Sequence, residues 1–226
     1  MSKEPQNLAK LAYETGYQDF YGRKFRVSHF VLVPRPETEQ LVDEALLLAG
    51  KPYLPGIKAP RRTLPERPTI LDIGTGSGNL AITLKLELPE ATVIGLDISE
   101  AALEIARANA MELKAKVKFQ KSNLLLDYFG PEPDLIVANL PYVDRKWDWL
   151  DKEALSFEPK NALYAGRDGL EFILGLLIEI NALHWSPKII LEADPCQHQA
   201  LEEFAAILGY QVLKISGFAV LLARLS

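Results

Sequence analysis

The 226-residue sequence is poor in cysteine and histidine. A single cysteine, Cys196, excludes an internal disulfide framework, and its thiol is expected to be partly buried and inert. The three histidines are scattered along the chain and make no metal-ligand spacing with one another. We therefore expect no metal site.

Excess positive charge and long apolar runs are also missing. The formal net charge of -5 at pH 7 leaves no overall electrostatic footprint for duplex nucleic acid, so nucleic acid is disfavoured as a partner. The longest apolar run, 170–180, contains Glu171 and Glu179 and is too short to span a bilayer, and the first residues have no apolar signal core. We expect a cytoplasmic protein with no membrane partner.

The chain does contain a regular alternation of strand and helix patterns from residue 69 onward. Such an alternation of short β-branched runs with helical patterns is typical of a parallel sheet that is covered on both faces. Two final runs, 211–215 and 219–224, predict an antiparallel hairpin. The expected core strands are 69–73, 91–97, 116–120, 134–138 and 188–192, and the expected helices are 79–88, 100–113, 169–183 and 195–208. The pattern predicts a doubly wound α/β fold of about seven strands over residues 69–226.

The residues before this core are predicted to form a short extension. Residues 1–50 are expected to contain an N-terminal stub, a β-hairpin around Gly22 and a first helix. Pro36, Glu37 and Glu39 suit the N-terminus of that helix, because proline lacks the N–H that would be unpaired there and the helix dipole favours negative charge. Residues 51–68 are rich in proline and basic residues and are expected to be an exposed linker.

A glycine-rich turn follows the first core strand. Its residues are Asp72, Gly74, Thr75, Gly76, Ser77 and Gly78. Glycine lets the backbone pass close to a ligand, and a helix N-terminus follows immediately. The spacing G-x-G-x-G differs from the G-x-G-x-x-G of dinucleotide sites, and the carboxylate of Asp72 suits a ligand with an amine and a sulfonium better than one with phosphates. The pattern favours S-adenosylmethionine as cofactor.

Two further polar residues are candidates for this cofactor. Asp97 ends the next strand, where its carboxylate can accept hydrogen bonds from both ribose hydroxyls; capping of the following helix together with Ser99 is the alternative. Asn123 follows the third strand and can meet the adenine amino group or serve only in a turn. The adjacent Ile98 and Leu124 complete the expected cofactor contacts.

The candidate acceptor site follows the fourth core strand, at Asn139-Leu140-Pro141-Tyr142. The side-chain oxygen of Asn139 and the backbone carbonyl of Leu140 can each accept one N–H of a planar amino group, which directs the delocalised lone pair of its nitrogen toward a methyl carbon. Pro141 stiffens the loop, and Tyr142 offers an aromatic face for stacking. We therefore predict methyl transfer to an amide or base nitrogen, without a strong general base.

Taken in order along the chain, these motifs resemble the glutamine N5-methyltransferase family that modifies peptide-chain release factors, the HemK type. The matching motifs are Val33-Pro-Arg-Pro-Glu-Thr-Glu39, Leu71-Asp-Ile-Gly-Thr-Gly-Ser-Gly78, Asn139-x-Pro-Tyr142, Glu158-Pro-x-x-Ala-Leu163, Gly166-x-Asp-Gly169, Leu191-Glu192 and Gln197. The resemblance implies a Rossmann-like, class I S-adenosylmethionine-dependent methyltransferase fold. It also implies that the acceptor is the glutamine of the Gly-Gly-Gln tip of release factors.

The resemblance further implies which residues contact the two reactants. The glycine turn, Asp97 and Asn139 would contact the cofactor, and Asn139–Tyr142 would hold the acceptor glutamine. Additional substrate contacts are expected at Phe30, Arg35, Pro36 and Glu37.

Two departures from the family pattern leave alternatives open. The family usually has Asn-Pro-Pro-Tyr, whereas Leu140 gives a form more typical of RNA adenine dimethyltransferases. Because a glutamine amide and an adenine amine present similar NH2 edges, an adenine N6-methyltransferase acting on RNA or DNA is the alternative function. The family also usually carries a helical N-terminal domain, and here a stub is expected before Tyr17. The partner would then dock less tightly, or on the basic linker around Arg61 and Arg62, and a non-catalytic binding module is a third possibility.

Overall fold

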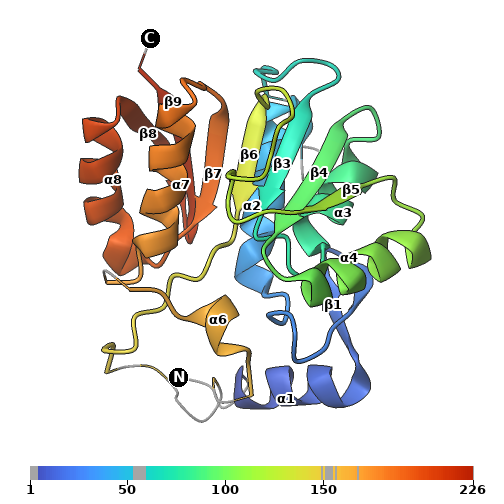
Figure 1. Ribbon diagram of the computed structural model, residues 1–226. Coiled ribbons are helices and arrows are strands. Elements are labelled where there is room, and N and C mark those ends of the chain that lie inside the picture. The colour runs from blue at the N-terminus through green and yellow to red at the C-terminus, as the bar shows by residue number, and fades with distance from the viewer. Residues whose placement is uncertain are drawn as a thin grey trace.

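A seven-stranded sheet forms the centre of the computed structural model, which describes residues 5–52, 60–148, 150, 155, 157–166 and 168–225 (Figure 1). The strand order is β5-β4-β3-β6-β7-β9-β8, with β9 antiparallel to both of its neighbours and the other pairs parallel. The strands are β3 (Thr69–Ile73), β4 (Thr92–Asp97), β5 (Lys118–Lys121), β6 (Leu135–Ala138), β7 (Lys188–Glu192), β8 (Tyr210–Ser216) and β9 (Ala219–Arg224). The chain therefore reverses its direction across the sheet between β3 and β6, the place where open α/β sheets bind ligands.

Helices cover both faces of this sheet (Figure 1). The helices are α1 (Pro5–Thr15), α2 (Glu39–Leu48), α3 (Asn79–Glu87), α4 (Glu100–Glu112), α6 (Lys160–Leu163), α7 (Glu171–Ala182) and α8 (His198–Ile207), with 3-10 turns η1 (Pro36–Thr38) and η2 (Pro195–Gln197). Helices α2 and α3 share one apolar cluster with the sheet, and α7 and α8 share another. Helices α1 and α6 lie beyond the carboxyl ends of the strands (Figure 1).

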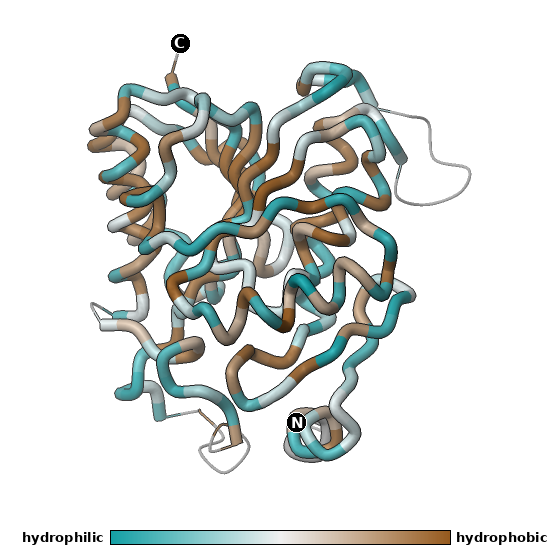
Figure 2. The backbone as a smooth tube through the Cα atoms, turned by 45° about the vertical axis from the view of Figure 1, so that its right-hand side comes forward, coloured by the Kyte–Doolittle hydropathy of each residue, from teal (hydrophilic) through white to brown (hydrophobic). Residues whose placement is uncertain are grey.

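The central strand β6 shows why this sequence forms a two-faced sheet. Leu135 and Val137 pack under α2 and α3, whereas Ile136 and Ala138 pack under α7 and α8. Successive side chains of a strand point to opposite faces, so a strand covered on both sides must be apolar throughout. Figure 2 shows the same pattern over the sheet as a whole, where the central strands are mostly hydrophobic and the outer helices are mixed.

The predicted doubly wound α/β fold is confirmed, with strand and helix bounds close to those expected. One predicted helix is divided: residues 195–197 form η2, and α8 begins only at His198. The cause is a capping box in which Asp194 accepts the N–H of Cys196 (2.9 Å) and its own N–H donates to Gln197 Oε1 (2.9 Å).

The residues expected to be a stub contain helix α1, which the sequence analysis missed. Its buried residues Ala9 and Ala12 pack with Val31 and Val33. The Tyr13 hydroxyl donates a hydrogen bond to the carbonyl of Val31 (2.9 Å). The residues of α1 do form an amphipathic pattern, so the sequence carried a signal for this helix that was not recognised.

The predicted hairpin is present as β1 (Tyr17–Phe20) and β2 (Arg23–Arg26), an antiparallel pair around Gly22. The described residues of the expected linker are mostly exposed, but the segment is anchored at Leu64. The N–H groups of Thr63 (2.8 Å) and Leu64 (3.1 Å) donate to the carbonyl of Leu48, and Leu64 is buried in the cluster of α2 and α3. Residues 53–59 of this segment lie outside the described residues.

Candidate active site

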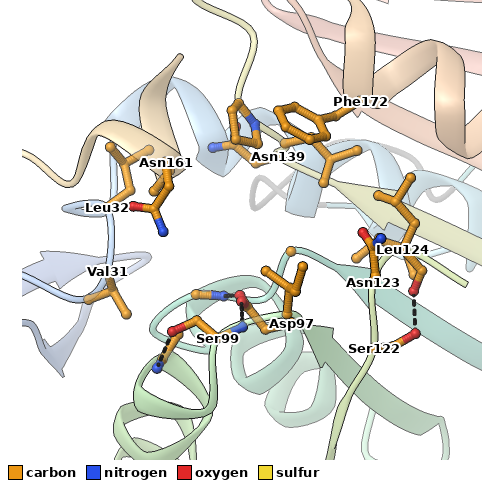
Figure 3. A pocket seen from close by; sticks show the side chains of 18 of the residues that line it. Val31, Leu32, Asp97, Ser99, Ser122, Asn123, Leu124, Asn139, Asn161 and Phe172 are labelled. Carbon is orange, nitrogen blue, oxygen red and sulfur yellow. Dashed lines mark hydrogen bonds between the residues drawn. The ribbon is translucent and has the colours of Figure 1, made fainter. Parts of the chain in front are cut away.

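A cavity of about 340 Å³ lies at the carboxyl ends of β3, β4 and β6 (Figure 3). In Figure 3, Asn139 and Asn161 approach it from one side, and Asp97 and Ser99 approach from the other. The cavity is therefore walled by several elements that are distant in the sequence.

The backbone conformation and close packing of the turn after β3 both favour glycine. Gly74, Gly76 and Gly78 all have positive φ angles, of 73°, 53° and 79°, a region that other residues adopt only with strain. A Cβ atom at Gly74 would lie 2.9 Å from Leu140 Cδ2, and one at Gly78 would lie 3.1 Å from the Cβ of Ala106. The absent side chains let the turn lie close to the acceptor loop and to α4.

Asp72 lies beneath this turn rather than on the cavity wall. Its Oδ2 accepts the hydroxyl of Thr75 (2.6 Å) and the N–H of Ala81 (3.1 Å). Burial raises the pKa of Asp72 to about 7, and both hydrogen bonds oppose that rise. Thr75 and Ser77 line a smaller neighbouring cavity that also reaches Asn139. Asp72 was predicted to contact the cofactor; the structure places it off the cavity wall, where its hydrogen bonds hold the turn in shape.

Asp97 and its neighbour Ile98 do line the main cavity. The Asp97 carboxylate accepts the N–H groups of Gly76 (2.8 Å) and Ser99 (2.9 Å). Burial raises its pKa, and these backbone hydrogen bonds oppose the rise. The capping role considered for this region is also present, because the Ser99 hydroxyl accepts the N–H of Ala102 (3.2 Å) at the start of α4.

Asn123 and Leu124 form another wall of the cavity together with Ser122 (Figure 3). The N–H of Asn123 donates to Asp127 Oδ2 (3.2 Å), and Leu124 has a positive φ of 49°. This turn leaves the side chain of Asn123 exposed at the cavity. The predicted cofactor residues Asp97, Ile98, Asn123 and Leu124 therefore come together from two loops.

The acceptor loop divides into a part that lines the cavity and a part that anchors the loop. Asn139, Leu140 and Pro141 line the cavity. Tyr142 does not: its hydroxyl donates to Glu192 Oε1 (3.0 Å), and its carbonyl accepts the side-chain N–H of Gln197 (2.8 Å). Burial and the adjacent Glu192 raise the pKa of Tyr142. Tyr142 therefore fixes the end of the loop rather than offering a free aromatic face.

Asn139 is held by a residue of the N-terminal extension. Its Nδ2 donates to the hydroxyl oxygen of Thr38 (2.9 Å), and Thr38 is 1% exposed. Behind Thr38 lies the buried carboxylate of Glu192, whose pKa is raised by burial to about 7 while hydrogen bonds from Thr38 and Tyr142 oppose the rise. These four side chains join β6, β7 and η1 into one polar network.

Of the remaining residues predicted to contact the substrate, one lines the cavity and three do not. Phe30 lines the cavity and is 65% exposed. Arg35, Pro36 and Glu37 are not on its wall. Instead the Arg35 guanidinium forms an ion pair with the buried carboxylate of Glu158, and burial raises the pKa of Glu158 while Arg35 opposes the rise. This pair ties the extension to the segment that leads into α6.

Several wall residues were missed by sequence reasoning. The missed positions include Val31, Leu32, Ser99, Ser122, Asn161, Ala162 and Phe172. Asn161 and Ala162 lie inside the Glu158-Pro-x-x-Ala-Leu163 motif, which therefore carried a signal that was given no role. Phe172 is one apolar residue in the apolar helix α7, and nothing in the sequence distinguishes it from its neighbours.

Three further features concern parts of the chain outside the cavity: the lone cysteine, metal-ligand groups and membrane-spanning helices. Cys196 is an exposed residue, so the expectation of a partly buried thiol was wrong. Partial desolvation of the thiol and the adjacent Asp194 raise its pKa to about 11, which keeps the thiol protonated. In the part of the chain that the structure describes, no group of three His, Cys, Asp or Glu residues is placed to hold a metal. No helix among the described residues is long and apolar enough to cross a membrane.

Comparison with known proteins identifies the family. Residues 66–203 match a methyltransferase domain. The chain belongs to the methyltransferase domain family. The chain is 43% identical over 170 residues to the release factor glutamine methyltransferase of Koribacter versatilis. The aligned region covers 74% of this chain and 56% of that protein. The chain is also 36% identical over 194 residues to the enzyme of the same name from Enterococcus faecalis, covering 84% of this chain and 65% of that one. The chain thus spans just over half to about two thirds of these relatives.

Solved methyltransferase structures share the fold. The methyltransferase of Pyrococcus furiosus matches with a TM-score of 0.63 at 18% identity, over 97% of this chain and 96% of that one. The ribosomal protein L11 methylase of Lactobacillus delbrueckii matches with a TM-score of 0.57 at 24% identity, over 93% and 91% of the two chains. The class I methyltransferase fold implied by the sequence motifs is confirmed.

Proposed function

We propose that this methyltransferase transfers a methyl group from S-adenosylmethionine to the side-chain amide nitrogen (N5) of the glutamine in the Gly-Gly-Gln motif of peptide-chain release factors. The observation that carries the proposal is the position of Asn139. Its amide lies on the cavity wall, is fixed from behind by Thr38, and stands across the cavity from Asp97 (Figure 3). Relatives at 36–43% identity are named for this reaction.

The wall that contains Asp97 and Asn123 fits the cofactor. The backbone hydrogen bonds to Asp97 favour its charged form, and that carboxylate can accept hydrogen bonds from ribose hydroxyls. The exposed amide of Asn123 suits the edge of an adenine, with Ile98 and Leu124 as apolar contacts on its faces. When bound, S-adenosylmethionine supplies an electrophilic methyl group on a sulfonium.

The wall that contains Asn139 fits the acceptor. With Nδ2 donating to Thr38, the Oδ1 atom of Asn139 is the part of the amide left to accept an N–H of the glutamine. The carbonyl of Leu140 is the second acceptor, so that two fixed oxygens hold the NH2 group and orient its nitrogen. Positioning of two reactants in this way supplies a large part of the acceleration in a group transfer.

The charges around the cavity agree with a reaction that needs no strong base. Asp97 is the one carboxylate among the described residues that line the cavity. Asn139 and Leu140 would hold and orient the amide nitrogen for methylation, and the proton that the nitrogen gives up would leave to the solvent at the open side of the cavity. The apolar wall residues Leu140 and Phe172 limit the access of water to the bound amide, which strengthens the hydrogen bonds that hold it.

The partners and location follow from the proposed acceptor. Release factors act in translation termination, so we place the enzyme in the cytoplasm with a protein as its substrate. The ring of Phe30, 65% exposed at the cavity, suits contact with a protein tip that enters from solvent.

The test is transfer of a radiolabelled methyl group from S-adenosylmethionine to three acceptors in parallel. The acceptors are purified release factors, the same factors with the tip glutamine replaced, and total ribosomal RNA. We expect label on the intact factors alone, and the Asn139→Ala variant serves as the matched inactive control. Label on RNA would instead support adenine methylation, and label on none of the three would contradict the proposal.

A further inference from the structure

We propose that Thr38 and Glu192 are positioning residues that set the orientation of the Asn139 amide, so that its oxygen faces the acceptor. The inference rests on the proposed function, since it concerns how the same site holds an NH2 group. Thr38 and Glu192 do not line the main cavity, and they act through Asn139.

The proposed chain of hydrogen bonds from Asn139 through Thr38 to Glu192 is called the relay below. Its first step is the hydrogen bond from Asn139 to Thr38. A hydroxyl oxygen can accept from Nδ2 while its own proton points elsewhere. Thr38 is 1% exposed, so bulk solvent does not compete for that proton. The distance of 2.9 Å between Asn139 Nδ2 and the Thr38 oxygen is that of a well-formed hydrogen bond.

The second step is the carboxylate behind Thr38. Glu192 is 1% exposed, and Tyr142 donates to its Oε1 (3.0 Å). The other oxygen, Oε2, is buried and has no hydrogen-bond partner among the described residues, so it is open to accept the Thr38 proton. Hydrogen bonding from Thr38 also stabilises the charged form of this group.

An ionised Glu192 decides which atom donates at each step, because a carboxylate can only accept hydrogen bonds. The Thr38 proton therefore points toward Glu192, the Thr38 oxygen accepts from Asn139 Nδ2, and Oδ1 is left facing the cavity. With the opposite orientation of the amide, Oδ1 would face the Thr38 oxygen, and two N–H donors would face the N–H groups of the acceptor. Neither contact could form, so the reversed amide is unproductive.

The direction depends on the proton of Glu192. A protonated Glu192 can donate to Thr38, which frees the Thr38 proton for Asn139 and favours the reversed amide. The charged groups that act on Glu192 are Glu37, which raises its pKa, and Arg35, which lowers it; the Tyr142 phenol remains protonated. Turnover should therefore fall as the pH drops below about 7.

The experiment compares Thr38→Val, which keeps the shape but removes the hydroxyl, with Thr38→Ser, which restores it. We expect Thr38→Val to lower kcat about tenfold while the dissociation constant for S-adenosylmethionine stays within about twofold, and Thr38→Ser to recover most of the activity. The kcat of Thr38→Val should also lose its fall below about pH 7. Equal losses in both variants, or a Thr38→Val enzyme with wild-type kcat and pH profile, would overturn the proposal.

A second readout needs no acceptor at all. Hydrogen exchange of the Asn139 side-chain amide can be followed by NMR in the full chain, with the signal assigned by its loss in Asn139→Ala. We expect slow exchange in the wild type and in Thr38→Ser, and fast exchange in Thr38→Val. Equal exchange rates in the three proteins would overturn the relay, whichever molecule proves to be the acceptor. Absence of methyl transfer by the wild type to release factors, with the exchange pattern as expected, would count against the proposed function alone.

Discussion

The two walls of the cavity are built by different means. The wall around Asp97 is held by contacts within one β-α-β unit, such as the hydrogen bond from Gly76 to Asp97, 21 residues apart. The wall around Asn139 is held by contacts between distant segments: Asn139 to Thr38 is 101 residues apart, and Arg35 to Glu158 is 123 apart. The donor wall can thus form with the core of the sheet, whereas the acceptor wall needs the N-terminal extension in place.

This difference implies that the two binding functions can be lost separately. Changes in the segment from Val31 to Thr38 should impair use of the acceptor and spare the cofactor, whereas changes in the glycine turn or at Asp97 should do the reverse. The following substitutions test that separation.

The largest effect is expected for Asn139→Ala. Loss of the amide removes one of the two acceptors that hold the NH2 group, so kcat should fall on the order of 100-fold while cofactor affinity changes far less. Steady-state kinetics and calorimetric titration of the cofactor measure the two quantities. A loss of cofactor affinity as large as the loss of kcat would place Asn139 on the donor side instead.

Asp97→Ala should show the opposite pattern. Removal of the carboxylate takes away the predicted ribose contacts and leaves the N–H groups of Gly76 and Ser99 without their acceptor. Cofactor affinity should fall by about ten- to a hundredfold, since hydrogen bonds to charged groups contribute about 1.5–3 kcal/mol each. Asp97→Asn is the matched control and should retain part of the affinity. Unchanged affinity in calorimetry would remove Asp97 from the cofactor site.

Arg35→Ala tests the contact that anchors the extension. Without the guanidinium, the buried Glu158 has lost its cationic partner, and the segment that carries Phe30 and Val31 to the cavity is no longer tied to α6. The KM for the acceptor should rise about tenfold, with cofactor affinity within about twofold. Arg35→Lys keeps the charge and should show a smaller rise. Parallel losses for both ligands would show that the two walls are not independent.

The smallest effect concerns stability. Burial raises the pKa of Glu192 to about 7, so the folded state binds this proton more tightly than the unfolded state does. The stability that the bound proton contributes is lost as the pH rises from the pKa of Glu192 in the unfolded state through about 7. Between about pH 6 and about pH 8 this amounts to about 1 kcal/mol. Thermal unfolding of wild type and Glu192→Gln over this range should show a flatter pH dependence in the variant. Identical slopes would mean that Glu192 does not titrate there.

The sequence predicted the sheet well because its strands are unambiguous. Residues such as Leu135 and Ile136 form an apolar run that only a strand covered on both faces accommodates, and the glycine turn carries its own spacing. Helix α1 was missed although its residues form an amphipathic pattern, because the residues before Tyr17 were interpreted together as a stub.

The residues of the site that were predicted correctly face the cavity and lie at or directly after the end of a predicted strand. Asn139 and Asp97 meet both conditions, and both line the cavity. Thr38 and Glu192 lie in recognised motifs but do not line the main cavity, and their contacts with side chains of the acceptor loop exist only after folding. Arg35 lay in a recognised motif, yet the structure pairs it with Glu158 and places it off the cavity wall, which spacing along the chain cannot show.

The contact between Gly74 and Leu140 links the donor side of the cavity to the acceptor side. A side chain at position 74 would need space that Leu140 Cδ2 now occupies, at 2.9 Å from the added atom. Such a side chain would therefore displace Leu140, and through it the loop that is proposed to hold the acceptor, so a substitution at this one position on the donor side of the cavity would also be felt on the acceptor side.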